Sequence, residues 1–165
     1  MFEQGDVVDG KFRVEGLCSD AGGMGVILFV TPVGSQQAPR LVLKYCRDTA
    51  EENLRRFRRE TRLLASFQGN SKVVQIVDRN LDHDPPYFVM EYYQDGDLSG
   101  RAASLRASLE HQESVFLQMI DCIQELHARN EFHRDIKLQN FLVSGERLIV
   151  LSLIHISEPS RLGMN

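Results

Sequence analysis

The stretch that most constrains how this chain can fold is residues 133–140, His-Arg-Asp-Ile-Lys-Leu-Gln-Asn, which has apolar residues on both sides. Within it, Asp135 can accept a proton, Lys137 can neutralise phosphate charge, and Asn140 can bind a metal through its amide oxygen. The apolar flanks predict a loop held between two buried segments, so that its polar side chains point in fixed directions. Positioning and electrostatic catalysis of phosphoryl transfer require such an arrangement.

Residues 133–140 resemble the catalytic loop of protein kinases, H-R-D-x-x-x-x-N. The lysine two positions after the aspartate is typical of the serine/threonine branch; the tyrosine branch usually lacks it, and kinases of the aminoglycoside type lack both the arginine and this lysine. The resemblance implies that Asp135 orients and deprotonates a hydroxyl, that Lys137 neutralises the γ-phosphate of ATP, and that Asn140 binds Mg²⁺. The alternative is a polar loop that matches the motif by chance.

A glycine-rich turn at residues 20–25 lies between two runs that predict strands, residues 11–14 and 26–30. Glycine lets backbone N–H groups approach a triphosphate closely, although such a turn alone is also typical of a plain hairpin. Beside the catalytic loop, it resembles the kinase glycine-rich loop G-x-G-x-x-G-x-V. The ATP-contacting residues that this resemblance implies are Gly22, Gly23, Met24, Gly25 and Ile27. Asp20 replaces the first glycine, and its charge disfavours phosphate unless it faces away.

Residues 40–46 predict the next strand, in which a period of two places Val42 and Lys44 on one face. The stretch 41–44 resembles the kinase motif V-A-I-K, whose lysine pairs with the α- and β-phosphates. Val42 stands at the usual alanine position and would line the adenine pocket. Taken in isolation, Lys44 fits an edge position in solvent equally well.

A helix is predicted after this strand, starting with a capping box made of Thr49 and Glu52. Its apolar stripe comprises Leu54, Phe57, Thr61 and Leu64. Glu60 lies beside the stripe and matches the helix C glutamate of the kinase family, so we expect it to form an ion pair with Lys44. The alternative is an ordinary surface glutamate.

The same helix is strongly basic. Its arginines are Arg55, Arg56, Arg58, Arg59 and Arg62. A solvated helix face is the preferred interpretation, and a docking site for phosphate or an acidic partner is the alternative.

Two more strands are predicted at residues 73–77 and 87–90, separated by a turn-rich segment at 82–86. The end of the second strand resembles the kinase hinge. In that family the backbone at the positions of Glu91 and Tyr93 hydrogen-bonds adenine, and the same is implied here.

The large lobe is expected to start with a turn at residues 94–97, with Asp97 capping a helix that begins at Leu98. The alternative for Asp97 is a contact with the ribose. A second helix is predicted at 113–127, with His127 hydrogen-bonded in the core. Its expected buried stripe is Phe116, Met119, Ile120, Ile123 and Leu126. After the catalytic loop, Leu142 matches the floor of the adenine pocket, beneath a roof of Val42 and Ile27.

Composition and charge indicate which other classes of protein are unsuitable for this chain. The chain has 165 residues and a net charge of −4, so it suits one domain and gives no sign of nucleic-acid binding. Its three cysteines are far apart, and it has neither a signal-peptide pattern nor a long apolar run. We therefore expect a cytoplasmic protein with no membrane contact in this segment. The kinase resemblance implies that its partner is a Ser/Thr-containing protein substrate.

The predicted fold class is α+β and protein-kinase-like, with an antiparallel small-lobe sheet and helix C over about residues 11–94, and the first helices and catalytic loop of the large lobe over about 95–150. The compact N-terminus and the stretch Gly-Gly-Met-Gly at 22–25 resemble bacterial-type serine/threonine kinases, which implies the use of ATP and Mg²⁺. A pseudokinase-like nucleotide- or protein-binding module is the alternative.

The kinase resemblance stops near residue 150. The family's Asp-Phe-Gly should fall at 152–154, where this chain has Ser-Leu-Ile. Residues 151–161 resemble the translation of a transposase adapter used in sequencing libraries, so we expect 151–165 to be a non-native tail; a divergent natural tail is the alternative. Without Asp-Phe-Gly we expect the fragment to be inactive, because Asn140 alone is a poor Mg²⁺ site.

Overall fold

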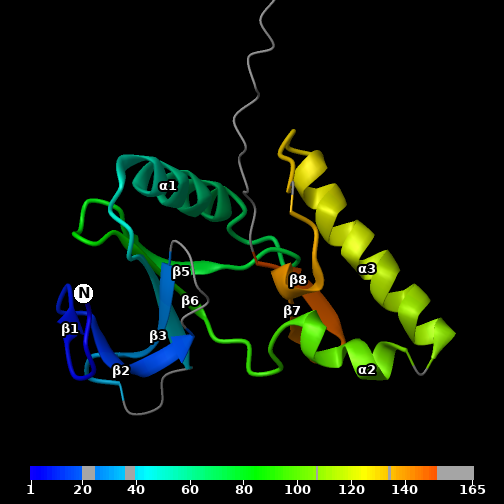
Figure 1. Cartoon of the computed structure of the whole chain (residues 1–165), viewed down its shortest axis with the longest axis horizontal. Coiled ribbons are helices and arrows are strands. Elements are labelled where there is room, and N and C mark those ends of the chain that lie inside the picture. The colour runs from blue at the N-terminus through cyan, green and yellow to red at the C-terminus, as the bar shows by residue number, and fades with distance from the viewer. Residues whose placement is uncertain (20–24, 36–39, 107, 134, 152–165) are drawn as a thin grey trace, which may run out of the picture.

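The computed structural model describes residues 1–19, 25–35, 40–106, 108–133 and 135–151. Six strands form an antiparallel sheet in the order β1-β2-β3-β4-β6-β5 (Figure 1). Their bounds are β1 Val7–Val8, β2 Phe12–Ser19, β3 Gly25–Pro32, β4 Leu41–Cys46, β5 Ile76–Asn80 and β6 Tyr87–Glu91. The helix α1, Glu51–Ser66, connects β4 to β5 and lies over one face of the sheet.

The second part of the chain is smaller and mostly helical. Its elements are the 3₁₀ helix η1 Leu98–Arg101, α2 Ala102–Leu105, α3 Leu109–His127, the 3₁₀ helix η2 Leu138–Asn140, and the hairpin strands β7 Phe141–Ser144 and β8 Arg147–Val150. Figure 1 shows this hairpin between the sheet and α3. A parallel bridge between Val73 and Val150 joins the two parts, and Val74 N–H donates to the Val150 carbonyl over 3.1 Å. The expected α+β class is therefore observed.

Alternation along the strands divides the buried side chains of the sheet into two cores, one on each face. In β4, Leu41 and Leu43 lie in the core on the open face, whereas Val42 and Cys46 lie in the core that α1 covers. Lys44 shares the α1 side with Val42, as the period of two predicts. The expected stripe of α1 is also confirmed, with three of its residues fully buried and Leu54 half-buried.

Three local predictions are wrong. The capping box does not form: α1 is capped at Ala50 without a side-chain hydrogen bond, and Asp48 instead accepts from the Ala50 N–H over 2.9 Å. The strand expected at 73–77 runs from Ile76 to Asn80, because the buried Val73 and Val74 pair with the β7–β8 hairpin. The helix predicted from Leu98 is broken into η1 and α2.

The buried stripe of α3 also differs from the expectation. α3 packs on β8 and buries Val115, Cys122, Ile123 and Leu126. Phe116 and Ile120, which were expected in the core, are 61% and 37% exposed. His127 is exposed rather than hydrogen-bonded in the core, and its ring lies 5.2 Å from that of Phe132. The hairpin covers only one side of α3, which explains these differences.

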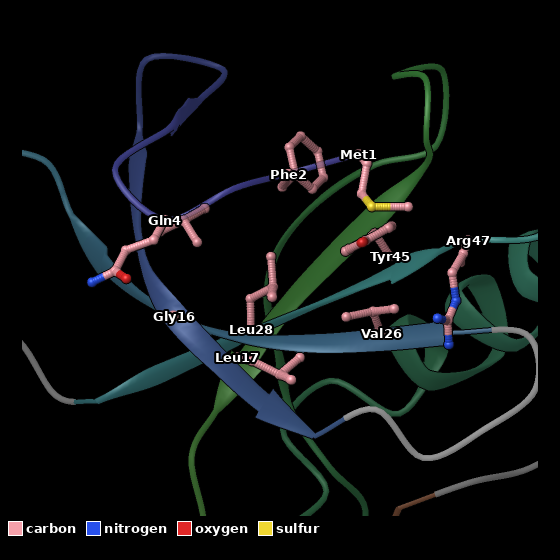
Figure 2. A pocket seen from close by; sticks show the side chains of 10 residues that line it. Met1, Phe2, Gln4, Gly16, Leu17, Val26, Leu28, Tyr45 and Arg47 are labelled. Atoms are coloured by element: carbon pink, nitrogen blue, oxygen red, sulfur yellow. The ribbon is translucent and has the colours of Figure 1, made fainter.

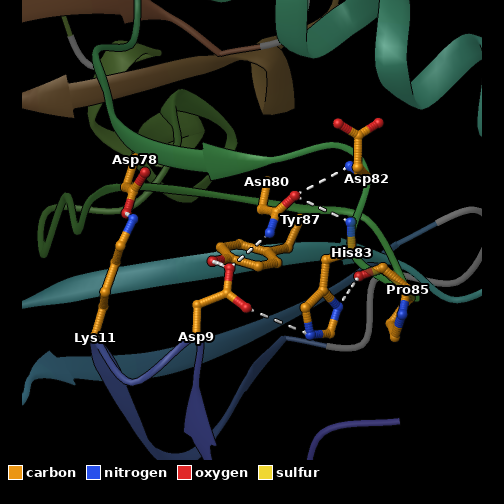
Figure 3. Close-up of polar contacts among 8 residues, drawn as sticks. All are labelled: Asp9, Lys11, Asp78, Asn80, Asp82, His83, Pro85 and Tyr87. Carbon is orange, nitrogen blue, oxygen red and sulfur yellow. Dashed lines mark hydrogen bonds and ion pairs between the residues drawn. The ribbon is translucent and has the colours of Figure 1, made fainter.

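A polar network fixes the N-terminal edge of the sheet (Figure 3). Asp9 accepts hydrogen bonds from the Tyr87 hydroxyl over 2.5 Å and from the Asn80 side chain over 2.8 Å. Lys11 and Asp78 form an ion pair of 2.8 Å alongside. These contacts join the β1–β2 turn to β5 and β6, at the far edge of the sheet from β1.

Candidate active-site cleft

In the described part of the chain, each face of the sheet borders a cavity. The cavity on the open face has a volume of about 280 Å³, and apolar side chains such as Phe2 and Leu28 line much of it (Figure 2). None of the described candidate residues lines this cavity. On the α1 side lies a cleft of about 860 Å³, bounded by the sheet, the segment after β6 and the loop that precedes β7.

The cleft on the α1 side brings together the candidate residues identified from the sequence. Those that line it are Gly25, Ile27, Val42, Lys44, Glu60, Glu91, Tyr93, Asp135, Lys137, Asn140 and Leu142. Gly22, Gly23 and Met24, and the neighbouring Asp20, lie outside the described residues. Segments up to 117 positions apart in the sequence, from Gly25 to Leu142, therefore meet at one cleft.

Lys44 and Glu60 form the predicted ion pair. The Lys44 Nζ lies 3.0 Å from Glu60 Oε1 and 3.2 Å from Oε2, so the ammonium binds both carboxylate oxygens. Glu60 is 7% exposed, and the Lys44 Nζ also lies 5.7 Å from the centre of the Phe88 ring. A buried carboxylate is costly without such a partner. The pair thus fixes α1 against β4 and directs a cation into the cleft.

Asp135, Lys137 and Asn140 lie together on the opposite wall. Lys137 Nζ is 2.8 Å from Asp135 Oδ2, and the Asn140 amide donates to the Asp135 carbonyl over 2.7 Å and to Oδ2 over 3.2 Å. Asn140 is buried, whereas the Asp135 side chain is 31% exposed. The amide therefore fixes the orientation of a carboxylate that stays open to the cleft.

His133 holds this loop in place from the buried side. Its ring is fully buried and stacks on Phe141, with centroids 6.4 Å apart and planes 7° from parallel. The Asp135 N–H donates to His133 Nδ1 over 3.3 Å, so the proton of the neutral ring is on Nε2. Burial lowers the pKa of His133, which favours this neutral form. Among the described residues, no group accepts a hydrogen bond from Nε2.

Apolar residues form the inner walls of the cleft. Val42 and Ile27 lie on the sheet side, and Leu142 comes from β7. β7 is held in place by the Val143 N–H, which donates to the Gly96 carbonyl over 2.9 Å, and by a bridge between Leu142 and Asp97. Asp97 caps η1 as predicted, accepting from the Ser99 N–H over 2.9 Å. Two apolar walls facing each other form a slot that suits a flat ring.

Tyr93, at the mouth of the cleft, is half-buried. Burial, and to a smaller extent the neighbouring Glu91, raises the pKa of its phenol, so its side chain stays neutral at physiological pH.

The sequence missed several residues of the cleft. Those not assigned a binding role include Cys18, Ser19, Phe57, Tyr92, Gly96, Gln139 and Leu151. Ser19 pairs directly with Ile27 across β2 and β3, so register from the glycine turn would have found it. Leu151, the first residue of the segment expected to lie outside the fold, donates its N–H to the Asn140 carbonyl over 2.9 Å.

Within the described ranges, no three side chains of His, Cys, Asp or Glu gather closely enough to hold a metal ion. Neither α1, α3 nor any shorter helix of the described chain combines the length and hydropathy that crossing a membrane requires.

Comparison with known proteins identifies the family. The model of the protein kinase domain matches residues 22–154. A calcium/calmodulin-dependent serine/threonine-protein kinase 1 of Oryza sativa subsp. japonica is 36% identical over 91 residues, which are 54% of this chain and 15% of the relative. CDPK-related kinase 5 of Arabidopsis thaliana is 30% identical over 115 residues, 68% of this chain and 19% of the relative. Serine/threonine-protein kinase ULK3 of Rattus norvegicus is 40% identical over 74 residues, 44% of this chain and 16% of the relative.

The chain therefore belongs to the protein kinase domain family and has the kinase-like α+β fold. Its matches span between 15% and 19% of the length of these three relatives. The relatives come from plants and a rodent, so they give no support to the expectation of a bacterial-type kinase.

Proposed function

We propose that this member of the protein kinase family carries the ATP-binding half of a serine/threonine kinase, which transfers the terminal phosphoryl group of ATP to a protein hydroxyl. One observation carries the proposal: the Lys44–Glu60 pair shares one cleft with Asp135, Lys137 and Asn140. The matching relatives are named as serine/threonine kinases, which supports the choice of hydroxyl substrate.

In the proposed reaction, the substrate hydroxyl oxygen attacks the γ-phosphorus, the bond to the ADP oxygen breaks, and the hydroxyl proton moves to Asp135. Lys44 pairs with the α- and β-phosphates, and Lys137, beside Asp135, neutralises charge on the transferring group. Asn140 acts on Asp135 directly, because its amide holds the carboxylate at 3.2 Å. Glycine backbone at 22–25 would cover the phosphates, and the backbone of Glu91 and Tyr93 would bind adenine between Val42, Ile27 and Leu142.

The residues that line the cleft suit ATP, but they form a poor site for Mg²⁺. The cleft of about 860 Å³ offers a paired lysine and an apolar slot, which suit phosphates and a purine ring respectively. Mg²⁺ prefers several carboxylate and phosphate oxygens, but Asp135 is already paired with Lys137, and Asn140 is neutral. The sequence contains no Asp-Phe-Gly. The described residues of the cleft are therefore a poor site for Mg²⁺, and we expect this 165-residue chain to transfer no phosphoryl group by itself.

A pseudokinase-like module that binds nucleotide or protein without catalysis is the second candidate. Asp20 at the first glycine position and Ser-Leu-Ile at 152–154 favour it. The complete set of Lys44, Glu60, Asp135 and Asn140 favours the enzyme.

The domain limits and location are part of the same proposal. We place the small lobe at about 11–94 and the start of the large lobe at about 95–150, and we propose that residues 151–165 are a non-native tail. A cytoplasmic location is consistent with Cys18, Cys46 and Cys122, which are free thiols in the structure.

ATP titration by calorimetry, with and without Mg²⁺, tests the binding half of the proposal. Lys44→Met should weaken ATP binding by about tenfold or more, because the charge-assisted contact to phosphate is lost. Lys72→Met is the matched control: Lys72 pairs with Glu125 at 3.2 Å, away from the cleft, and should change affinity by less than about twofold. If both variants weakened ATP binding equally, the cleft would not be the nucleotide site.

Transfer of labelled phosphate to a serine peptide separates the two candidates, and should be measured in the longest natural form of the protein. Asp135→Asn should lower turnover by about 10²–10⁴-fold while ATP affinity stays nearly unchanged. Turnover that is absent from the natural protein, together with intact ATP binding, would favour the pseudokinase-like module.

A further inference from the structure

The outward face of α1 carries a row of arginines that the proposed function does not use. α1 buries Phe57, Glu60, Thr61 and Leu64. At 100° per residue, Arg55, Arg59 and Arg62 lie on the opposite side of the helix, and all three are exposed. Because α1 lies over the sheet (Figure 1) and packs against it through its buried residues, the opposite side of the helix is turned away from the sheet. We call these three residues the arginine row.

Acidic residues neutralise only the beginning of the helix. Glu51 lies 3.8 Å from Arg55, with both side chains well exposed, and Glu52 lies 2.5 Å from Arg56. In the part of the chain that the structure describes, Arg59 and Arg62 have no carboxylate within ion-pair distance. The positive charge of the row therefore increases toward the C-terminal half of α1.

Helix stability does not account for this charge. Arginines one turn apart, such as Arg55 and Arg59 or Arg59 and Arg62, repel each other and destabilise a helix. Cations stabilise a helix in its last turn, but the last turn of α1 contains none. The whole chain has a net charge of −4, so the row is a local positive surface on an acidic protein.

The strand β5 also carries an exposed arginine, which lies on the sheet face and outside the arginine row. Arg79 is exposed and pairs across β5 and β6 with Phe88, whose ring lies 5.6 Å from that of Phe57 on α1. Directly opposed residues share a face of the sheet, so Arg79 lies on the side that α1 covers.

We propose that the arginine row is a docking site for a segment of a partner protein that carries phosphoserine or phosphothreonine. A phosphate monoester has close to two negative charges and three acceptor oxygens, and a guanidinium binds it through two parallel hydrogen bonds. Neighbouring arginines on a helix are about 5–6 Å apart at Cβ, so two of them can bind one phosphate. The choice of phosphorylated protein rests on the proposed function, because phosphoryl transfer to Ser or Thr produces such segments.

Fluorescence anisotropy with the 165-residue chain tests the proposal. Three labelled peptides of one sequence should carry serine, phosphoserine or glutamate at the central position. The phosphoserine peptide should bind about tenfold or more tightly than the serine peptide, and Arg59→Gln/Arg62→Gln should abolish this preference. The control pair Arg106→Gln/Arg147→Gln removes the same charge from exposed positions elsewhere and should leave the preference intact.

The assay needs no catalysis, so its outcome is independent of the proposed kinase activity. A circular dichroism spectrum of each variant establishes that it is folded, and the single variant Arg59→Gln replaces the pair if the pair unfolds. Three results would overturn the proposal: equal binding of the serine and phosphoserine peptides, equal losses in the two double variants, or binding only to vesicles of anionic lipid. Equal binding of the glutamate and phosphoserine peptides would replace phosphate recognition with general acidic recognition and would also overturn it.

Discussion

The two long helices of this chain have similar sequence patterns but different surroundings. α1 and α3 contain 16 and 19 residues, and each repeats apolar side chains at helical spacing. In α1 the expected stripe is buried against the sheet and carries the glutamate that pairs with Lys44. In α3 the β7–β8 hairpin covers one side only, and Phe116 and Leu117 are 61% and 55% exposed. Spacing therefore identifies an apolar helix, but the element packed against it decides which residues are buried.

Removing one phenylalanine from each helix is the most severe test of this contrast. Phe57→Ala should lower the free energy of unfolding by about 3–5 kcal/mol, because Phe57 is 2% exposed and its loss leaves a cavity beside Phe88. Phe116→Ala, the matched variant on α3, should cost less than about 1 kcal/mol. Urea unfolding followed by circular dichroism measures both, and similar losses would contradict the contrast.

A smaller effect is expected at the polar edge of the sheet. Tyr87→Phe should lower the free energy of unfolding by about 1–2 kcal/mol, because it removes the hydroxyl that donates to Asp9. Tyr92→Phe, which alters a tyrosine that contacts Phe29 through its ring, should change it by less than about 0.5 kcal/mol.

The effect of Tyr87→Phe should also depend on pH. Hydrogen bonds from Asn80 and Tyr87 hold the pKa of Asp9 below its ordinary value of 3.8. This stabilisation is therefore complete above that value and is lost as the pH falls through the lower pKa of the folded state. In this acidic range the free energies of unfolding of the wild-type protein and Tyr87→Phe should therefore become more similar. A difference between them that stays constant down to pH 2 would show that Asp9 is not its cause.

The smallest expected change in stability comes from the exposed face of α3. Phe116→Ser/Leu117→Ser should alter the free energy of unfolding by no more than about 0.5 kcal/mol, since both side chains already contact solvent. It should nevertheless reduce concentration-dependent association in light scattering, because exposed apolar patches promote it. Leu109→Ser, at an 80% exposed position in the first turn of the helix, is the control. A large loss of stability would show that this face is packed in solution.

The same contrast explains how much the sequence could predict. Local periodicity combined with fixed motif spacing predicts the strands β2, β3, β4 and β6, the α1 stripe and the Lys44–Glu60 pair, and these are confirmed. The capping of α1 at Ala50 and the late start of β5 depend on which polar group or hairpin lies nearby, and spacing contains no such information. In the cleft, Asp135 and Asn140 were predictable because their motif is contiguous. Cys18 and Tyr92 were missed because only the folded sheet brings them there.

The join between the two parts of the chain has a consequence for how the sequence can diverge. Val74 N–H donates to the Val150 carbonyl, and Val150 N–H donates to the Lys72 carbonyl over 2.9 Å. Both bonds connect main-chain groups, which every residue except proline can provide. Substitutions at these positions can therefore accumulate over evolutionary time without separating the β7–β8 hairpin from the sheet, provided that proline does not arise at 74 or 150 and that a side chain of similar volume fills the space.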